Sequence, residues 1–145
     1  MRLKGYENQV HPFAYLNEGV LKMGSMFREF FNKGKNREST GEVIYANDPK
    51  EDEALQKARI EISGRVQGVG FRFSTQQAAQ ELGVKGIVRN ESDGTVYVEA
   101  IAEQKAMDQF IEALRKGPSP AADVDKVVVT FDPNIEEKSN FSQVN

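Results

Sequence analysis

The sequence predicts an α+β fold in which two helices cover one face of a mainly antiparallel sheet. Between residues 59 and 131, four segments with strand-like patterns are interrupted by two segments whose apolar residues have helical spacing. Their order is strand, helix, strand, strand, helix, strand. An apolar helix face is buried when it packs on a sheet, so we expect a ferredoxin-like βαββαβ sandwich whose second sheet face meets solvent.

The first half of this pattern is a strand, a glycine-rich loop, a helix and a second strand. Residues 59–63 alternate as a half-buried strand, and the loop follows at residues 64–72. Residues 74–82 place Ala78, Ala79 and Leu82 on one helical face, and Gly83 ends the helix. Residues 84–90 form the second strand.

The second half begins with a hairpin turn at residues 91–94, where Asp-Gly stands at the usual turn position. Residues 95–100 form the third strand and residues 127–131 the fourth, while residues 139–144 can add a short fifth. The helix between them covers residues 104–116 and ends at Gly117-Pro118. Its buried stripe has i, i+3, i+4, i+7 spacing and consists of Met107, Phe110, Ile111 and Leu114.

Composition limits the function. A net charge of −3 and a pI near 5.3 argue against a general nucleic-acid binder, so any basic site is local. The absence of cysteine excludes disulfides, thiolate catalysis and zinc–thiolate sites. We expect a cytoplasmic protein, because no apolar run has the length of a membrane span and the first residues do not resemble a signal peptide.

The composition changes near residue 53, which predicts two parts. Residues 1–53 form an N-terminal extension, expected to be flexible or partly helical, and residues 54–145 form the folded domain. Within the extension, residues 16–37 combine an apolar face with basic residues, as in a helix that docks on a membrane surface or a partner protein. A disordered tail, or a true start at Met23 or Met26, is the simpler explanation of the same residues.

The glycine-rich loop has the composition of an anion-binding site. Glycines allow successive backbone N–H groups to converge, the following helix presents the positive end of its dipole, and Arg65 and Arg72 flank the loop. No acidic residue lies between Glu61 and Glu81.

Two known phosphate-binding loops do not fit this sequence. A Walker A loop requires Lys-Ser/Thr after the last glycine, where this chain has Phe71-Arg72. The third glycine of a dinucleotide-binding loop is replaced by Phe73. A tight turn with solvated arginines is the structural alternative.

Three motifs together resemble the acylphosphatase family, over roughly residues 55–145. They are residues 64–72 (GRVQGVGFR), 86–90 (GIVRN) and 93–96 (DGTV). The resemblance implies hydrolysis of small acyl phosphates without cofactor or metal. In that family the arginine that closes the loop binds the phosphate, here Arg72, and an asparagine at the end of the second strand positions the attacking water, here Asn90. The implied phosphate-binding residues are Arg65, Val66, Gln67, Gly68, Val69, Gly70, Phe71 and Arg72.

Other chemistries lack the necessary residues. His11 is the only histidine, so histidine-based catalysis and His-ligated metals have no second member. Carboxylate pairs such as Asp123/Asp125, Glu136/Glu137 and Asp52/Glu53 are better explained as solvated charges than as metal ligands. The alternative function is a catalytically silent phosphate-binding module that docks a partner through its extension. We expect a monomer with an acyl phosphate as substrate, and the sequence does not identify the acyl group.

Overall fold

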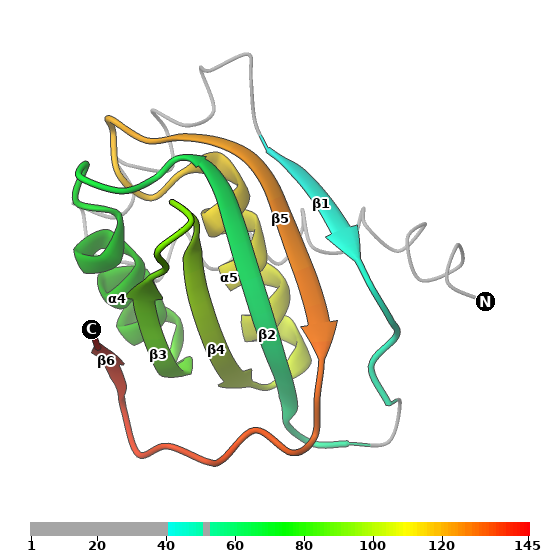
Figure 1. The fold of residues 1–145 in the computed structure, drawn as a ribbon. Coiled ribbons are helices and arrows are strands. Elements are labelled where there is room, and N and C mark those ends of the chain that lie inside the picture. The colour runs from blue at the N-terminus through cyan, green and yellow to red at the C-terminus, as the bar shows by residue number, and fades with distance from the viewer. Residues whose placement is uncertain (1–40, 51–52) are drawn as a thin grey trace.

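The computed structural model describes residues 41–50 and 53–145, and within them it confirms the predicted α+β sandwich (Figure 1). The elements in chain order are β1 (Glu42–Tyr45), β2 (Gln56–Arg65), α4 (Phe71–Leu82), β3 (Lys85–Asn90), β4 (Val96–Ala102), α5 (Gln104–Lys116), β5 (Asp123–Phe131) and β6 (Phe141–Gln143). The predicted βαββαβ order is the run from β2 to β5.

The strands form one sheet in the order β1-β5-β2-β4-β3-β6. The inner pairs β2–β4, β2–β5 and β3–β4 are antiparallel, whereas the outer strands β1 and β6 pair in parallel with β5 and β3. Both helices lie on the same face of this sheet (Figure 1). Alternate residues of β2 and β4, including Ile60, Ile62 and Val98, point to that face and are fully buried.

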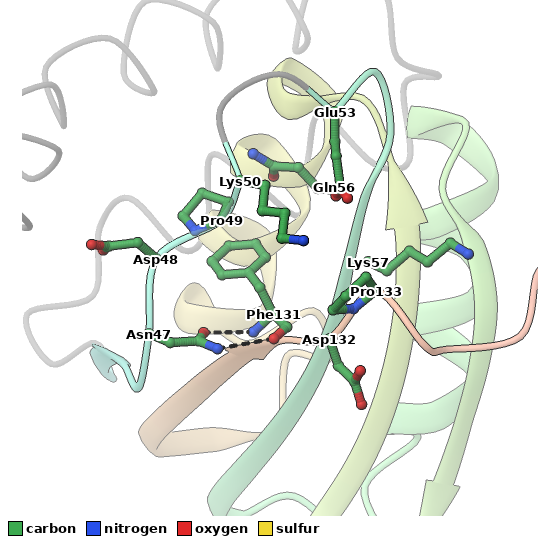
Figure 2. Close-up of a pocket in the computed structure, with 10 residues that line it drawn as sticks. All are labelled: Asn47, Asp48, Pro49, Lys50, Glu53, Gln56, Lys57, Phe131, Asp132 and Pro133. Atoms are coloured by element: carbon green, nitrogen blue, oxygen red, sulfur yellow. Dashed lines mark hydrogen bonds between the residues drawn. The ribbon is translucent and has the colours of Figure 1, made fainter.

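Strand β1 belongs to a segment that the sequence assigned to the flexible or partly helical extension. The structure instead adds Glu42–Tyr45 to the sheet, in register with residues 126–129 of β5. Beyond it, the Asn47 side chain continues the pairing: its Nδ2 donates to the Phe131 carbonyl at 2.9 Å and its Oδ1 accepts from the Phe131 N–H at 2.8 Å (Figure 2). Four residues give too short an alternation to stand out in the sequence, and the strand depends on β5 for its hydrogen bonds.

Strand β6 confirms the predicted short fifth strand. Phe141 is buried and packs edge-on against Phe110 of α5, with ring centroids 5.9 Å apart. Gln143 donates to Gln76 of α4 at 2.8 Å, and Gln76 donates in turn to the Phe141 carbonyl at 3.1 Å. One aromatic anchor and two amide hydrogen bonds therefore hold this edge strand against α4 and α5.

The two helices differ in how well the sequence defined them. Helix α5 has the predicted bounds, and its predicted apolar stripe is buried. Helix α4 begins at Phe71, three residues before the predicted start, so Arg72 lies in its first turn. No helix in the described residues is long and apolar enough to cross a membrane.

Candidate active site

The glycine-rich loop joins the end of β2 to the start of α4. Gly68 and Gly70 adopt left-handed backbone conformations, with φ of 75° and 79°. A Cβ at Gly68 would meet nothing within 4 Å, and one at Gly70 would approach only Ser119 Oγ, at 3.9 Å. The backbone conformation therefore requires these glycines, while the space above them stays open to a ligand.

Helix α4 begins without a side-chain cap. Its N-cap residue is Gly70, its first turn carries no acidic residue, and the Ser74 N–H donates to the Gly70 carbonyl at 3.1 Å. The N–H groups of Phe71, Arg72 and Phe73 consequently have no acceptor within the helix. Together with the positive end of the helix dipole, these donors favour an anion at this place.

The two predicted arginines flank the glycine-rich loop in the chain. Arg72 is the second residue of α4 and is partly exposed, and the described residues offer it no ion-pair partner. Arg65 is exposed at the end of β2, opposite Asp123 of β5. Arg72 is thus accessible to solvent and lies at the N-terminus of α4. Arg65 precedes the loop, at the end of β2.

Asn90 is the last residue of β3, where it pairs with Val96 of β4 and is partly buried. It is followed by the β3–β4 turn, residues 91–95, in which the Glu91 N–H donates to the Thr95 carbonyl at 2.9 Å. The carboxylate of Asp93 accepts from the Thr95 N–H at 3.0 Å and from its hydroxyl at 2.7 Å. These bonds to Thr95 lower the pKa of Asp93, because they favour its charged form.

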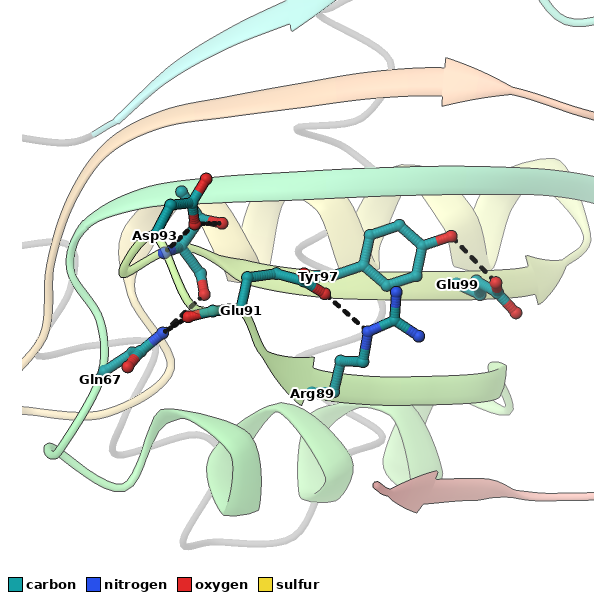
Figure 3. A network of polar contacts seen from close by, with 7 residues as sticks. Gln67, Arg89, Glu91, Asp93, Tyr97 and Glu99 are labelled. Carbon is teal, nitrogen blue, oxygen red and sulfur yellow. Dashed lines mark hydrogen bonds and ion pairs between the residues drawn. The ribbon is translucent and has the colours of Figure 1, made fainter. Parts of the chain in front are cut away.

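Gln67 connects the glycine-rich loop to this turn. Its side-chain Nε2 donates to the carbonyls of Glu91 and Thr95, each at 2.8 Å (Figure 3). Glu91 directly follows Asn90, so the loop and the residue beside Asn90 are joined by one side chain. The structure in this way brings the loop and the end of β3 to the same edge of the sheet.

Ser119 contacts the loop at a second point. Its hydroxyl donates to the Val69 carbonyl, and Ser119 itself is only 3% exposed. The sequence had assigned Gly117-Pro118 as the end of a helix and had given Ser119 no role. It had counted Gln67 only among the loop residues that supply N–H groups. Neither side-chain contact has a local sequence signal, because the partners lie 24 to 50 residues away.

A polar network on the open sheet face stabilises the strands next to Asn90. The Arg89 guanidinium lies 4.3 Å from the centroid of the Tyr97 ring and contacts Glu91 at 2.6 Å (Figure 3). The Tyr97 hydroxyl donates to Glu99 at 2.9 Å. Burial, and secondly this bond to Glu99, raise the pKa of Tyr97 to about 12. The Tyr97 hydroxyl therefore remains protonated at neutral pH.

Among the described residues, no group of three or more His, Cys, Asp or Glu side chains is arranged to hold a metal ion. The carboxylates named as possible ligands, Asp123 and Asp125, are exposed on β5, and Glu136 and Glu137 are exposed beyond it. The predicted docking segment, residues 16–37, lies outside the described residues.

These features define a class of protein: a ferredoxin-like α+β sandwich with an open, glycine-rich loop at the start of its first sandwich helix. Residues 58–143 match the acylphosphatase family model. The chain is 46% identical over 90 residues to the acylphosphatase of Enterococcus faecalis, a match that covers 62% of this chain and 99% of that protein. The chain belongs to the acylphosphatase family.

Solved structures agree with this assignment. The crystal structure of acylphosphatase from Bacillus subtilis superposes with a TM-score of 0.60 at 38% identity, covering 62% of this chain and 99% of that one. An acylphosphatase structure from Coxiella burnetii gives 0.60 at 32% identity, covering 66% and 98%. The family match begins after β1, so this strand is an addition to the part that the family model describes.

Proposed function

We propose that the glycine-rich loop and Arg72 hold the phosphoryl group of an acyl phosphate while Asn90 positions the water that attacks it. The protein is a hydrolase of the acylphosphatase family, so its reaction converts an acyl phosphate to a carboxylate and inorganic phosphate. The observation that carries the assignment of roles is the joining of the open loop, through Gln67, to the residue that follows Asn90.

The chemistry requires few groups. The leaving carboxylate has a conjugate acid with a pKa of about 4, so it departs without a proton from a general acid. Water oxygen forms a bond to phosphorus, the bond from phosphorus to the acyl oxygen breaks, and its electron pair leaves with the carboxylate. The proton of the water passes to a phosphate oxygen, which makes a protein base unnecessary.

Transition-state stabilisation then comes from placement and charge. A loose phosphoryl-transfer transition state spreads negative charge over its equatorial oxygens. Backbone N–H groups at the start of α4 and the planar guanidinium of Arg72 are suited to that distribution, since they are oriented before the substrate arrives. Asn90, at the neighbouring strand end, offers an amide that can orient a water for in-line attack.

The assay that tests this proposal is hydrolysis of benzoyl phosphate by the purified full-length protein in the presence of a chelator. We expect rapid loss of the anhydride and no hydrolysis of p-nitrophenyl phosphate, a phosphomonoester whose leaving group is poorer. Turnover that stops on chelation would contradict metal independence. Binding of inorganic phosphate without turnover would instead support the alternative, a silent phosphate-binding module.

The domain boundary, the cytoplasmic location and the monomeric state are part of the same proposal. A chain without cysteine suits a reducing compartment. Removal of residues 1–53 should leave turnover near that of the full chain, because the loop, Arg72 and Asn90 all follow the deletion. The same deletion should lower the midpoint of thermal unfolding, since it exposes the edge of β5 that β1 covers. Loss of turnover in a folded deletion variant would contradict the boundary.

A further inference from the structure

Gln67 has an unusually complete set of contacts for a loop side chain. A glutamine Nε2 carries two hydrogens, and both are engaged at 2.8 Å by the carbonyls of Glu91 and Thr95. A carbonyl oxygen accepts hydrogen bonds and cannot donate one, so both partners must face the amide nitrogen of Gln67 and not its amide oxygen. Two short hydrogen bonds to opposite sides of one turn fix both its position and its rotation.

The contacts of Gln67 join the glycine-rich loop to the turn that follows Asn90. Gln67 directly precedes Gly68-Val69-Gly70 in the loop, and Glu91 directly follows Asn90. Thr95 faces Glu91 across the same turn, because its carbonyl also accepts the Glu91 N–H. The shortest connection from the loop backbone to Asn90 thus consists of the Gln67 side chain, its hydrogen bond to Glu91 and one peptide unit. The connection along the backbone, in contrast, includes the whole of α4 and β3.

We propose that Gln67 is a positioning residue that sets the separation between the bound phosphoryl group and the water-orienting amide of Asn90. This inference rests on the proposed function of the site. Gln67 donates away from the loop, toward the turn, and acts on the reaction through Asn90. Its loss should let the end of β3 shift relative to the loop, and misplacement by about 1 Å costs on the order of 100-fold in rate.

Ser119 has the complementary task of orienting the loop itself. Its hydroxyl holds the Val69 carbonyl on the buried side, since Ser119 is almost fully enclosed. A carbonyl oxygen directed toward the ligand would repel a phosphate, so this bond keeps a negative dipole away from it. Gln67 therefore affects chiefly the placement of the water, and Ser119 chiefly the affinity for the anion.

The first experiment compares full-length Gln67→Ala with the wild type. With benzoyl phosphate as substrate, we expect kcat to fall about 100-fold, while the Kd for inorganic phosphate, measured by calorimetry, changes by less than about threefold. Gln67→Glu keeps the shape of the side chain but faces both carbonyls with an oxygen, so it should lose at least as much. Ser119→Ala should instead raise the Kd for phosphate several-fold, as expected for one lost hydrogen bond.

The matched control is Asp93→Ala. This variant removes two hydrogen bonds from the same turn but none that reach the loop. It should keep kcat within about threefold of the wild type. A fall in kcat equal to that of Gln67→Ala would show that turn stability, and not the connection to the loop, controls the rate.

A double-mutant cycle with Asn90→Ala separates positioning from a merely structural role. If Gln67 acts through Asn90, Gln67→Ala should have little further effect on kcat in a chain that already carries Asn90→Ala. Additive losses, or a normal kcat in the single variant, would overturn the inference. If Gln67→Ala does not fold, Gln67→Met, of similar size, replaces it in the cycle. A wild type without turnover would refute the proposed function itself, which is a different result from a normal Gln67→Ala enzyme.

Discussion

Helices α4 and α5 lie on the same face of the same sheet and have similar lengths, 12 and 13 residues, but they begin differently. Helix α5 follows β4 directly, and its N-cap Glu103 has an ordinary extended backbone, with φ of −66° and ψ of 158°. Helix α4 follows five irregular residues and starts from the left-handed Gly70. Helix α5 therefore starts from ordinary extended backbone, whereas α4 starts from a left-handed glycine and has no side-chain cap.

The buried faces of the two helices differ as well. Helix α5 buries large side chains, with Met107, Phe110 and Leu114 fully enclosed, while α4 buries Phe71 and then the small residues Thr75, Ala78 and Ala79. Apolar burial stabilises in proportion to area, so α5 contributes more to the core. The comparison teaches that, in one layer, the helix that buries the larger side chains is not the helix that carries the proposed phosphate site.

The largest expected contrast is between Arg72 and Lys105, the second residues of the two helices. Arg72→Ala should reduce kcat/KM by about 1,000-fold, because it removes the guanidinium from the anion site, and should abolish measurable phosphate binding. Lys105→Ala should change kcat/KM by less than about twofold. Steady-state hydrolysis of benzoyl phosphate measures both. Similar losses in the two variants would mean that the two helix starts are functionally alike.

The stability contrast comes next. Phe110→Ala on α5 should lower the free energy of unfolding by about 3–5 kcal/mol, because the ring is fully buried and contacts Phe141. Phe73→Ala on α4 should change it by less than about 0.5 kcal/mol, since this ring is 56% exposed. Urea unfolding followed by circular dichroism gives both values. If Phe73→Ala lost more unfolding free energy than Phe110→Ala, the conclusion that α5 contributes more to the core than α4 would be wrong.

A smaller effect distinguishes the two N-cap residues. Gly70→Ala should cost about 1–2 kcal/mol of unfolding free energy, because alanine is strained at a φ of 79°. It should also weaken phosphate binding as the loop adjusts. Glu103 has an ordinary extended backbone and its side chain makes no capping hydrogen bond, so Glu103→Ala should change the free energy of unfolding by less than about 0.5 kcal/mol. Equal stabilities of the two variants would show that the left-handed start of α4 carries no strain.

The smallest effect concerns Tyr97, which lies on the sheet face that neither helix covers. Its folded pKa, about 12, exceeds the ordinary value of 10.0, so its contribution to stability is complete below pH 10 and is lost as the pH rises through 12. Alkaline titration of tyrosinate absorbance should show one group titrating late. That group should be missing from Tyr97→Phe, whose stability should also depend less on pH in this range. A late group that persists in Tyr97→Phe would belong to another tyrosine.

Several elements were accessible from the sequence because their signals are local. The buried stripe of α5 and its Gly-Pro end predicted its bounds, and the Asp-Gly pair predicted the β3–β4 turn. Helix α4 was predicted too short because the glycines and the absence of a capping side chain hide its start. Strand β1 was missed because four residues with one partly exposed isoleucine form too weak a pattern.

In the candidate site too, some features followed from local motifs and others were visible only in the structure. The positions of Arg72 and Asn90 followed from motifs, and their roles remain a proposal. The contacts of Gln67 and Ser119 were not foreseen, although Gln67 lies in the loop that the sequence had singled out. Their partners come from a hairpin and a loop whose positions depend on the packing of α4 and α5 on the sheet.

The sequence by itself determined the order of strands and helices from β2 to β6, the family, and the glycines that allow a left-handed backbone, since each depends on residues close together in the chain. Only the tertiary structure decided which side chains hold the loop and which strand covers the edge of β5. Those interactions join residues 24 to 84 positions apart. A hydrogen bond forms only where donor and acceptor meet at about 3 Å, and over such separations the packing of the whole sheet and both helices determines where they meet.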